Sequence, residues 1–398
     1  MSFSITGTHA DAMEEMMQKA TAQDISPANN LGSFVTTSQD SAATRLMALN
    51  SDKHHACVGE YTSIANFHQD CVSMLADLYF DIEVRVIPVN EDTGVFLKLG
   101  SIYTGHYDPV KVAACLDGYE ARTGYNIPIH VDAASRGFVA PFTHGNTVDW
   151  DFNLPRVRSI NDAGHKFGLA TCAVGWVVWR DRSFVPESLI LEPDYLRWTQ
   201  LAFTLSFSRP NAPVAVQYYH LRRLGRDGYQ KAIYTLLSTA RELSFRLEDT
   251  GYYRCISDIH RYVSGQPLLS ALQQSEPGKN IRIPCHHHCD SFESGLPVEV
   301  FTFSDAFKQR CHWASLSHVS DKMHDRKFEF HVSLCSVHSH LLIAVDYELN
   351  GRGKNGQNID VLRIVVRSSA IDEMMEKIVA ELVDVVEELE SVGDHVTV

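Results

Sequence analysis

The sequence contains no apolar run long enough to cross a lipid bilayer, and no basic-then-apolar leader opens it. Positive charge is also scarce, because 35 Lys and Arg residues face 49 Asp and Glu residues, for a net charge of -14. An acidic chain is a poor partner for nucleic acid or for an anionic membrane surface. We therefore expect a cytoplasmic protein that binds neither nucleic acid nor membrane.

Paired cysteines and metal-ligand clusters are lacking as well. The nine cysteines are an odd number, and most lie within apolar runs, which favours reduced thiols over a disulfide framework. The segment Cys285-His286-His287-His288-Cys289 carries ligand types for a metal, but five consecutive residues cannot all point at one ion. No second CxxC or HxxxH cluster completes a site. We expect a loop there and no metal.

With 44% hydrophobic and 21% charged residues, the 398-residue chain has the composition of an ordinary globular protein. In its first half, segments with the hydrophobic pattern of a strand alternate with segments that have the pattern of a helix. This alternation predicts an α/β fold with a mostly parallel sheet covered on both faces. In such sheets ligands bind at the carboxyl ends of the strands. The expected strands cover residues 82–89, 95–102 and 127–131, and the expected helices cover 41–49, 66–79 and 110–123.

A helical pattern over 212–244, broken near Gly225 and Gly228, leads to a smaller α+β region. That region has predicted strands at 296–303 and 361–366 and an amphipathic helix at 371–391. Residues 304–357 give no convincing element. The predicted organisation is an N-terminal arm (1–60), a large domain (61–235) and a small C-terminal domain (236–398).

The turn at Lys166 stands out chemically. An apolar strand ending at Ile160 leads into the small-residue turn Ala163-Gly164-His165-Lys166, and a second apolar strand, 174–179, follows. Desolvation between two buried strands disfavours the ammonium form of a lysine and frees the amine as a nucleophile. His165 offers a ring face or an N–H to whatever the lysine attacks.

A second candidate, Asp132, follows the short apolar strand 127–131. A carboxylate there can pair with the ring nitrogen of a bound pyridine, and the small Ala134 lets an aromatic ring lie flat on the backbone. With Lys166 as covalent anchor, these residues match what a protein contributes to pyridoxal phosphate chemistry. The spacing alone equally allows Asp132 to cap a helix and Lys166 to be a solvated turn residue.

Long motifs strengthen the first interpretation. IHVDAASRGFVAPF (129–142), VDWDFNLPRVRSINDAGHKFGLATCAVGWVVWRD (148–181) and SFSRP (206–210) resemble the pyridoxal-phosphate-dependent group II decarboxylases, and the closest branch is the glutamate decarboxylases. NLGSFVTT (30–37), IYTG (102–105) and LRIVVR (362–367) match in the same order. The resemblance implies the aspartate aminotransferase type I fold, pyridoxal 5'-phosphate as cofactor and carboxy-lyase activity, most plainly conversion of L-glutamate to 4-aminobutyrate.

The resemblance also implies roles for individual residues. Lys166 would attach the cofactor, Asp132 would pair with its ring nitrogen, and His165 and Ala134 would contact its ring or phosphate. Ser208 sits where a phosphate contact comes from the neighbouring subunit, so a homodimer or larger homo-oligomer is expected. The implied substrate-binding residues are Arg363 for the α-carboxylate, Ser33 and Phe34 for the distal carboxylate, and Tyr195 in a loop over the substrate.

The chain departs from the family after Leu78-Tyr79, where relatives continue with a phosphate loop of Gly-Ser-Ser-Glu-Ala type, a helix and a strand. Here the sequence passes directly to Phe80-Asp81-Ile82-Glu83, and so the backbone cradle at a helix N-terminus is missing. Two alternatives therefore stay open: a catalytically dead or truncated homologue, and a decarboxylase for aspartate or another acidic amino acid.

Overall fold

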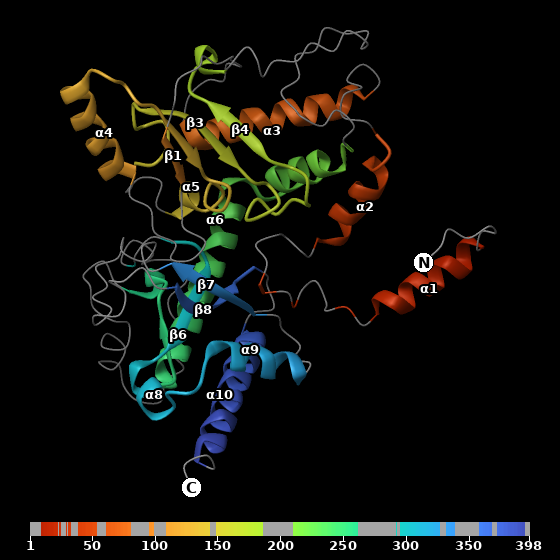
Figure 1. Cartoon of the computed structure of the whole chain (residues 1–398). Helices are drawn as coiled ribbons and strands as arrows, with labels where there is room; N and C mark the ends of the chain where they lie inside the picture. Colours follow the sequence, from red (N-terminus) through yellow and green to blue (C-terminus); the bar gives the residue numbers. More distant parts are fainter. Residues whose placement is uncertain are drawn as a thin grey trace, which may run out of the picture.

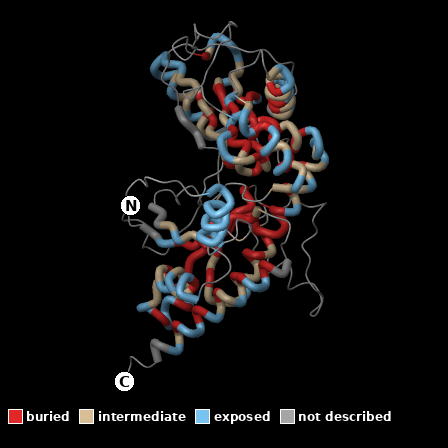
Figure 2. Tube along the Cα trace, turned by 90° about the vertical axis from the view of Figure 1, so that its right-hand side faces the viewer, coloured by how far each residue is buried: buried red, intermediate tan, exposed pale blue. Residues whose placement is uncertain are grey.

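A computed structural model of the chain shows two sheets joined by one long helix, α6 (Figure 1). The structure describes residues 9–22, 24, 29, 31–32, 39–53, 61–80, 95–98, 109–143, 149–185, 210–261, 292, 295–326, 332–338, 358–367 and 372–394. The buried residues gather around the two sheets and along α6 (Figure 2). Among the helices within these ranges, none combines the length and the apolar character needed to span a membrane.

The first sheet has the strand order β1-β2-β3-β4. Its strands are β1 (Val95–Lys98), β2 (Ile129–Asp132), β3 (Val157–Asp162) and β4 (Trp176–Trp179). The first three are parallel, and β4 runs antiparallel to β3, which confirms the predicted mostly parallel sheet. The strand expected at 82–89 lies outside the described residues.

Helices α3 (Thr62–Phe80) and α4 (Pro109–Thr123) lie beside this sheet (Figure 1), close to their predicted positions. Two further helices, α2 (Ser41–Asn50) and the short α5 (Ala140–Thr143), pack with α3 against α6. Val131, Val157 and Ile160 are fully buried in the core beneath. These β-branched residues suit the interior of a parallel sheet covered on both faces.

The long helix α6 (Ala212–Asp249) is interrupted at Gly225, where φ is +60° and ψ is -171°. Glycine has no Cβ to clash in that conformation, so the interruption falls where a glycine allows it. The sequence also predicted a break near Gly228, but that residue is helical. The predicted boundary between large and small domains, at residue 235, falls inside α6, and the domain division stays a prediction.

The second sheet is antiparallel, with the order β5-β6-β8-β7. Its strands are β5 (Tyr253–Cys255), β6 (Val298–Phe303), β7 (Ser333–His338) and β8 (Asn358–Val365), and α10 (Asp372–Asp394) closes the chain. The 3-10 turns η2 (Arg182–Phe184) and η4 (Asp258–His260) follow β4 and β5. The separate helix α1 (Ala10–Thr21) has no buried residue.

In the described part of residues 304–357, for which the sequence predicted no element, the structure contains two helices and the strand β7. Helix α8 (Asp305–Arg310) is capped by Ser304, whose hydroxyl accepts from the Phe307 amide. Helix α9 (Leu316–Asp325) begins with a reciprocal cap between Ser315 and His318. A histidine as the third residue of such a cap is unusual, since the common partner is Glu or Gln. The helix start was therefore missed.

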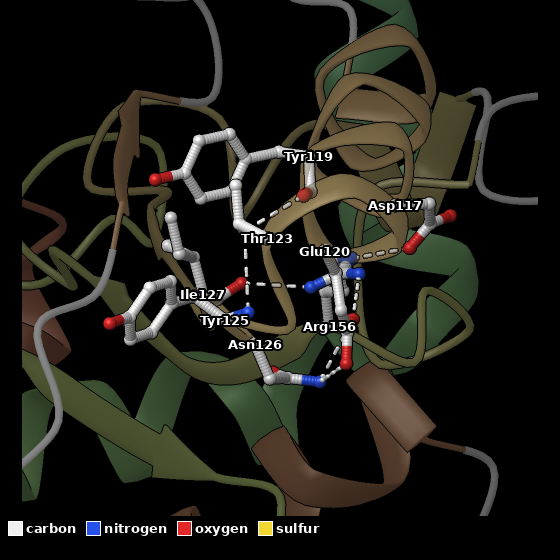
Figure 3. A network of polar contacts seen from close by, with 8 residues as sticks. All are labelled: Asp117, Tyr119, Glu120, Thr123, Tyr125, Asn126, Ile127 and Arg156. Carbon is white, nitrogen blue, oxygen red and sulfur yellow. Dashed lines mark hydrogen bonds and ion pairs between the residues drawn. The ribbon is translucent and has the colours of Figure 1, made fainter.

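Arg156, just before β3, ties α4 to the sheet (Figure 3). Its guanidinium forms ion pairs with Asp117 and Glu120 of α4 and donates to the Ile127 carbonyl at 3.2 Å. The Asn126 amide donates to both oxygens of Glu120, at 3.0 and 3.2 Å. The Arg156 side chain is buried, whereas its acidic partners reach solvent. Arg156 therefore fixes the segment that leads into β2.

Replacing Arg156 by methionine should lower the free energy of unfolding by about 1–2 kcal/mol, because buried hydrogen bonds are lost while the exposed carboxylates rehydrate. Urea unfolding followed by circular dichroism measures the change. Arg122→Met, at an exposed position of α4, is the matched control and should stay within about 0.5 kcal/mol of the parent. Equal effects of the two changes would contradict the role assigned to Arg156.

Candidate active site

The two predicted residues lie at the same edge of the first sheet. Asp132 is the last residue of β2 and pairs in register with Asn161 of the neighbouring β3. Lys166 follows the end of β3 by four residues. Because β2 and β3 are parallel, their carboxyl ends meet at one edge, which is where ligands bind in sheets of this kind.

The Lys166 side chain reaches back to the turn that follows Asp132. Its Nζ atom donates to the Ser135 hydroxyl at 3.0 Å, and Ser135 is only 2% exposed. Lys166 itself is half-buried, so it is not the solvated turn residue of the alternative interpretation. The Lys166 amine is thus held between the turn that follows β2 and the turn that follows β3, where it is partly removed from water.

The Asp132 carboxylate uses one of its two oxygens locally. Oδ1 accepts from the Ala134 amide at 3.1 Å and from the Asn161 side-chain amide at 3.0 Å. Oδ2 accepts no hydrogen bond from the residues that the structure describes. Asp132 stabilises the turn after β2 and does not cap a helix, because the next helix begins only at Ala140.

The turn that carries Lys166 is anchored from below by α6. The Gly168 carbonyl accepts from Gln217 Nε2 at 3.0 Å and from the Tyr229 hydroxyl at 2.9 Å. Tyr229 is buried against Phe138 and Phe142, and burial raises the pKa of its hydroxyl above the ordinary range. A buried carbonyl needs such donors, and these two make the turn rigid.

Close packing also dictates the residue before His165. A Cβ atom on Gly164 would lie 2.1 Å from Gln217 Oε1, and Gln217 is fully buried. The small residue that the sequence offers at this position is therefore required by the approach of α6.

His165 is held by its own backbone surroundings. Its Nδ1 atom lies 3.1 Å from the Val174 carbonyl, which can only accept, so Nδ1 carries the hydrogen. In the neutral ring the other nitrogen, Nε2, then has the lone pair. His165 is half-buried and directly precedes Lys166.

Three residues of this edge were missed from the sequence: Ser135, His130 and Asn161. Part of the signal was present in the spacing of polar residues on the two strands. His130 and Asp132 occupy alternate positions of β2, and Ser159 and Asn161 do so on β3. Residues two apart on a strand share a face, so the pair on each strand was predictable, whereas the register that brings the two pairs together was not.

The remaining predicted residues are divided between the second sheet and undescribed stretches. Arg363 lies on β8 and donates to the Gly32 carbonyl at 3.0 Å, beside the main-chain bond from Val365 to Leu31. The structure thus brings Arg363 to the residue that precedes Ser33. Four predicted residues lie outside the described residues: Ser33, Phe34, Tyr195 and Ser208.

No group of three or more His, Cys, Asp or Glu side chains that could hold a metal ion occurs in the ranges given above. Cys285-His286-His287-His288-Cys289 falls in an undescribed stretch. Six cysteines that the structure describes are free thiols, namely Cys71, Cys115, Cys172, Cys255, Cys311 and Cys335.

Comparison with known proteins agrees with this geometry. The pyridoxal-dependent decarboxylase conserved domain matches residues 32–263, more than half of the chain. The chain belongs to the pyridoxal-dependent decarboxylase family. The family match includes Asp132, Ser135, Asn161 and Lys166, all at the sheet edge described above.

Two curated relatives illustrate the likeness. The glutamate decarboxylase of Aliivibrio fischeri is 43% identical over 223 residues, which cover 51% of this chain and 47% of that protein. The chain therefore spans about half the length of that relative. Glutamate decarboxylase 5 of Arabidopsis thaliana is 25% identical over 469 residues, covering 97% of the chain and 83% of the relative. That alignment is longer than the 398-residue chain, so the relative has residues without a counterpart here.

Among solved structures, the glutamate decarboxylase of Lactobacillus brevis superimposes with a TM-score of 0.75 at 21% identity, covering 98% of this chain and 95% of that one. At this identity the likeness shows the fold, which is the type I fold of pyridoxal-phosphate enzymes. The predicted fold class is confirmed.

The residues at the sheet edge fit the ring half of the family's cofactor, pyridoxal phosphate. Lys166 supplies a partly desolvated amine, and Asp132 has a second carboxylate oxygen that no described donor uses. The first is what attachment to an aldehyde requires, and the second is what a protonated ring nitrogen requires.

Proposed function

We propose that this chain is a carboxy-lyase that converts L-glutamate to 4-aminobutyrate and carbon dioxide with pyridoxal 5'-phosphate. The observation that carries the proposal is the meeting of the Lys166 and Asp132 turns at one edge of a parallel sheet. The named relatives, both glutamate decarboxylases, support the choice of substrate.

Lys166 would hold the cofactor covalently, and Asp132 would face its ring nitrogen, with His165 and Ala134 against the ring or the phosphate. When bound, the cofactor supplies an electron sink for the bond between the α-carbon and the departing carboxylate. In the reaction that bond breaks, carbon dioxide leaves, and a proton replaces it on the α-carbon.

The chain's own residues prepare this chemistry in two ways. The Ser135 hydroxyl accepts from Lys166 Nζ and so fixes where the amine points, while the partial burial of Lys166 reduces hydration of its charged form. Asp132 would place its carboxylate at the end of β2 against the ring nitrogen, where it would hold a proton on that nitrogen. Fixed charges of this kind act without reorganising during the reaction.

Substrate recognition would come from the second sheet and the N-terminal arm. Arg363 would bind the α-carboxylate, and Ser33 and Phe34 would bind the distal one, with Tyr195 over the substrate. The hydrogen bond from Arg363 to Gly32 supports a shared location for the first three, since Gly32 directly precedes Ser33. A bidentate guanidinium suits a carboxylate at this place.

We also propose a homodimer as the active unit, in which Ser208 of one subunit contacts the phosphate bound by the other. The proposed division is an N-terminal arm (1–60), a large cofactor-binding domain (61–235) and a small domain (236–398). Both proposals derive from the family resemblance.

A second candidate function is a catalytically silent homologue that pairs with an intact subunit. It is favoured by one observation: the Arabidopsis alignment contains more positions than this chain has residues. The family resemblance implies that the phosphate loop after Leu78-Tyr79 is among the missing residues, and without it the phosphate would lack its main-chain donors.

Release of carbon dioxide from a panel of amino acids tests the proposal. Purified protein with added pyridoxal phosphate should act on L-glutamate and much less on L-aspartate, because the shorter side chain leaves the distal carboxylate unpaired. Preference for aspartate would change the substrate assignment. Absence of turnover on every acidic amino acid by well-folded, cofactor-loaded protein would favour the silent homologue.

A further inference from the structure

A chain of four polar side chains crosses from β3 to β2 and ends on Asp132. Ser159 Oγ lies 2.7 Å from His130 Nδ1, and His130 Nε2 lies 2.7 Å from Asn161 Oδ1. Asn161 Nδ2 then donates to Asp132 Oδ1 at 3.0 Å. The strand register explains the arrangement, because His130 pairs with Ser159 and Asp132 pairs with Asn161 on the same face.

The chemistry of the end groups fixes the direction of every hydrogen bond in this chain. An ionised carboxylate can only accept, so the Asn161 amide must turn its NH₂ group toward Asp132 and its oxygen toward His130. That oxygen in turn requires a hydrogen on His130 Nε2. In the neutral imidazole Nδ1 is then an acceptor for the Ser159 hydroxyl. Each hydrogen bond in this chain is therefore donated in the direction that leads to Asp132.

This arrangement has a consequence for the carboxylate. Asn161 and the Ala134 amide both donate to Oδ1, which restricts rotation of the carboxylate about its last bond and leaves Oδ2 as the available oxygen. The Asn161 main-chain carbonyl also accepts from the Ala133 amide at 2.9 Å, so one residue holds both the backbone and the side chain of the turn.

We propose that Asn161, oriented by His130, is a positioning residue that presents Oδ2 of Asp132 to the ring nitrogen of the cofactor. The proposal rests on the proposed function for its catalytic meaning, but the tautomer that it assigns to His130 does not depend on any cofactor. A merely structural role, in which the four residues only join β2 to β3, would alter stability and nothing at the cofactor.

The first test uses the chain without cofactor. Nitrogen chemical shifts of ¹⁵N-histidine-labelled protein report which ring nitrogen carries hydrogen, and His130→Gln identifies the signal. We expect hydrogen on Nε2 of His130 in the parent and loss of that preference in Asn161→Ala. A His130 signal with hydrogen on Nδ1 alone in the parent would overturn the proposal, whether or not the protein is an enzyme.

The second test uses protein loaded with pyridoxal phosphate and compares Asn161→Ala with Asn153→Ala, an exposed asparagine, as the matched control. Asn161→Ala should lower kcat about tenfold or more with KM within about threefold, and should change the pH dependence of the cofactor's visible absorbance. Asn153→Ala should match the parent. Asn161→Asp keeps the side-chain shape but cannot donate to Asp132, and should be at least as impaired.

Unchanged kcat and absorbance in Asn161→Ala, with only a lower melting temperature, would overturn the positioning role. If the parent itself neither binds the cofactor nor turns over while His130 carries hydrogen on Nε2, the proposed function fails and the positioning role at the cofactor fails with it. The hydrogen-bond direction would then stand as a property of the fold alone.

Discussion

Replacing Lys166 by arginine should abolish release of carbon dioxide from L-glutamate, lowering kcat by at least about 10³-fold. Arginine keeps a positive charge at the turn, but its guanidinium stays protonated and cannot form a covalent bond with an aldehyde. The side chain is still long enough to reach Ser135, so the turn held by Gln217 and Tyr229 should keep its structure.

Lys231→Arg is the matched control, because Lys231 is an exposed lysine on α6. It should retain the activity of the parent. The melting temperature of both variants should stay near that of the parent, which separates loss of chemistry from loss of fold. Measurable turnover by Lys166→Arg at more than a tenth of the parent rate would contradict the role proposed for Lys166.

The second large effect concerns stability and lies in the second sheet. Glu299 of β6 is fully buried, and its Oε2 accepts from the Ser257 hydroxyl at 2.8 Å. Burial raises the pKa of the carboxyl to about 7, and the nearby His260 and the hydrogen bonds of neighbouring side chains offset only part of that rise. His260 is itself 1% exposed and lies 3.6 Å from Glu248 of α6.

Because of the raised pKa, the contribution of Glu299 to stability decreases as the pH rises. The folded state binds the Glu299 proton more tightly than the unfolded state, whose carboxyl has the ordinary pKa of 4.5. The contribution to stability is therefore complete below about pH 4.5, falls as the pH rises, and levels off above about pH 7. This difference in pKa corresponds to a loss of about 3 kcal/mol in the free energy of unfolding between low and high pH.

Glu299→Gln should remove this dependence, because glutamine cannot ionise. At pH 4 the variant should unfold at nearly the same urea concentration as the parent, and at pH 8.5 it should be more stable by about 3 kcal/mol. Taking the difference between the two proteins at each pH cancels the titration of other groups. Glu387→Gln, on the exposed face of α10, should show no such trend. A constant difference across the pH range would contradict the buried, proton-binding carboxyl.

Much of the fold was predictable because local patterns agreed with it. Alternating apolar strands and helices gave the parallel sheet, and the glycine at 225 marked the interruption of α6. The region 304–357 was not predictable in the same way. Ser304 and Ser315 begin short helices by accepting from backbone amides, but serine is equally common in loops, so its presence did not distinguish the two.

The candidate-site residues at the strand ends were predictable from the sequence, and the contacts that orient them were not. Strand ends pointed to Asp132 and Lys166, because the carboxyl edge of a parallel sheet is common to every strand. The contacts that orient them depend on register: the His130–Ser159 and Asp132–Asn161 pairs follow an irregularity between Ile129 and His130 that no sequence pattern announces. A shift of one residue would have placed these side chains on the opposite face.

The most direct test of the account is reduction of the cofactor-loaded protein with borohydride, followed by peptide mass spectrometry. A lysine joined to pyridoxal phosphate becomes permanently modified, and we predict the added mass on Lys166 and on no other lysine. The parent should be labelled nearly completely, and Lys166→Arg should not be labelled at all. Folded, cofactor-saturated protein that carries no modification on Lys166 would contradict the central claim.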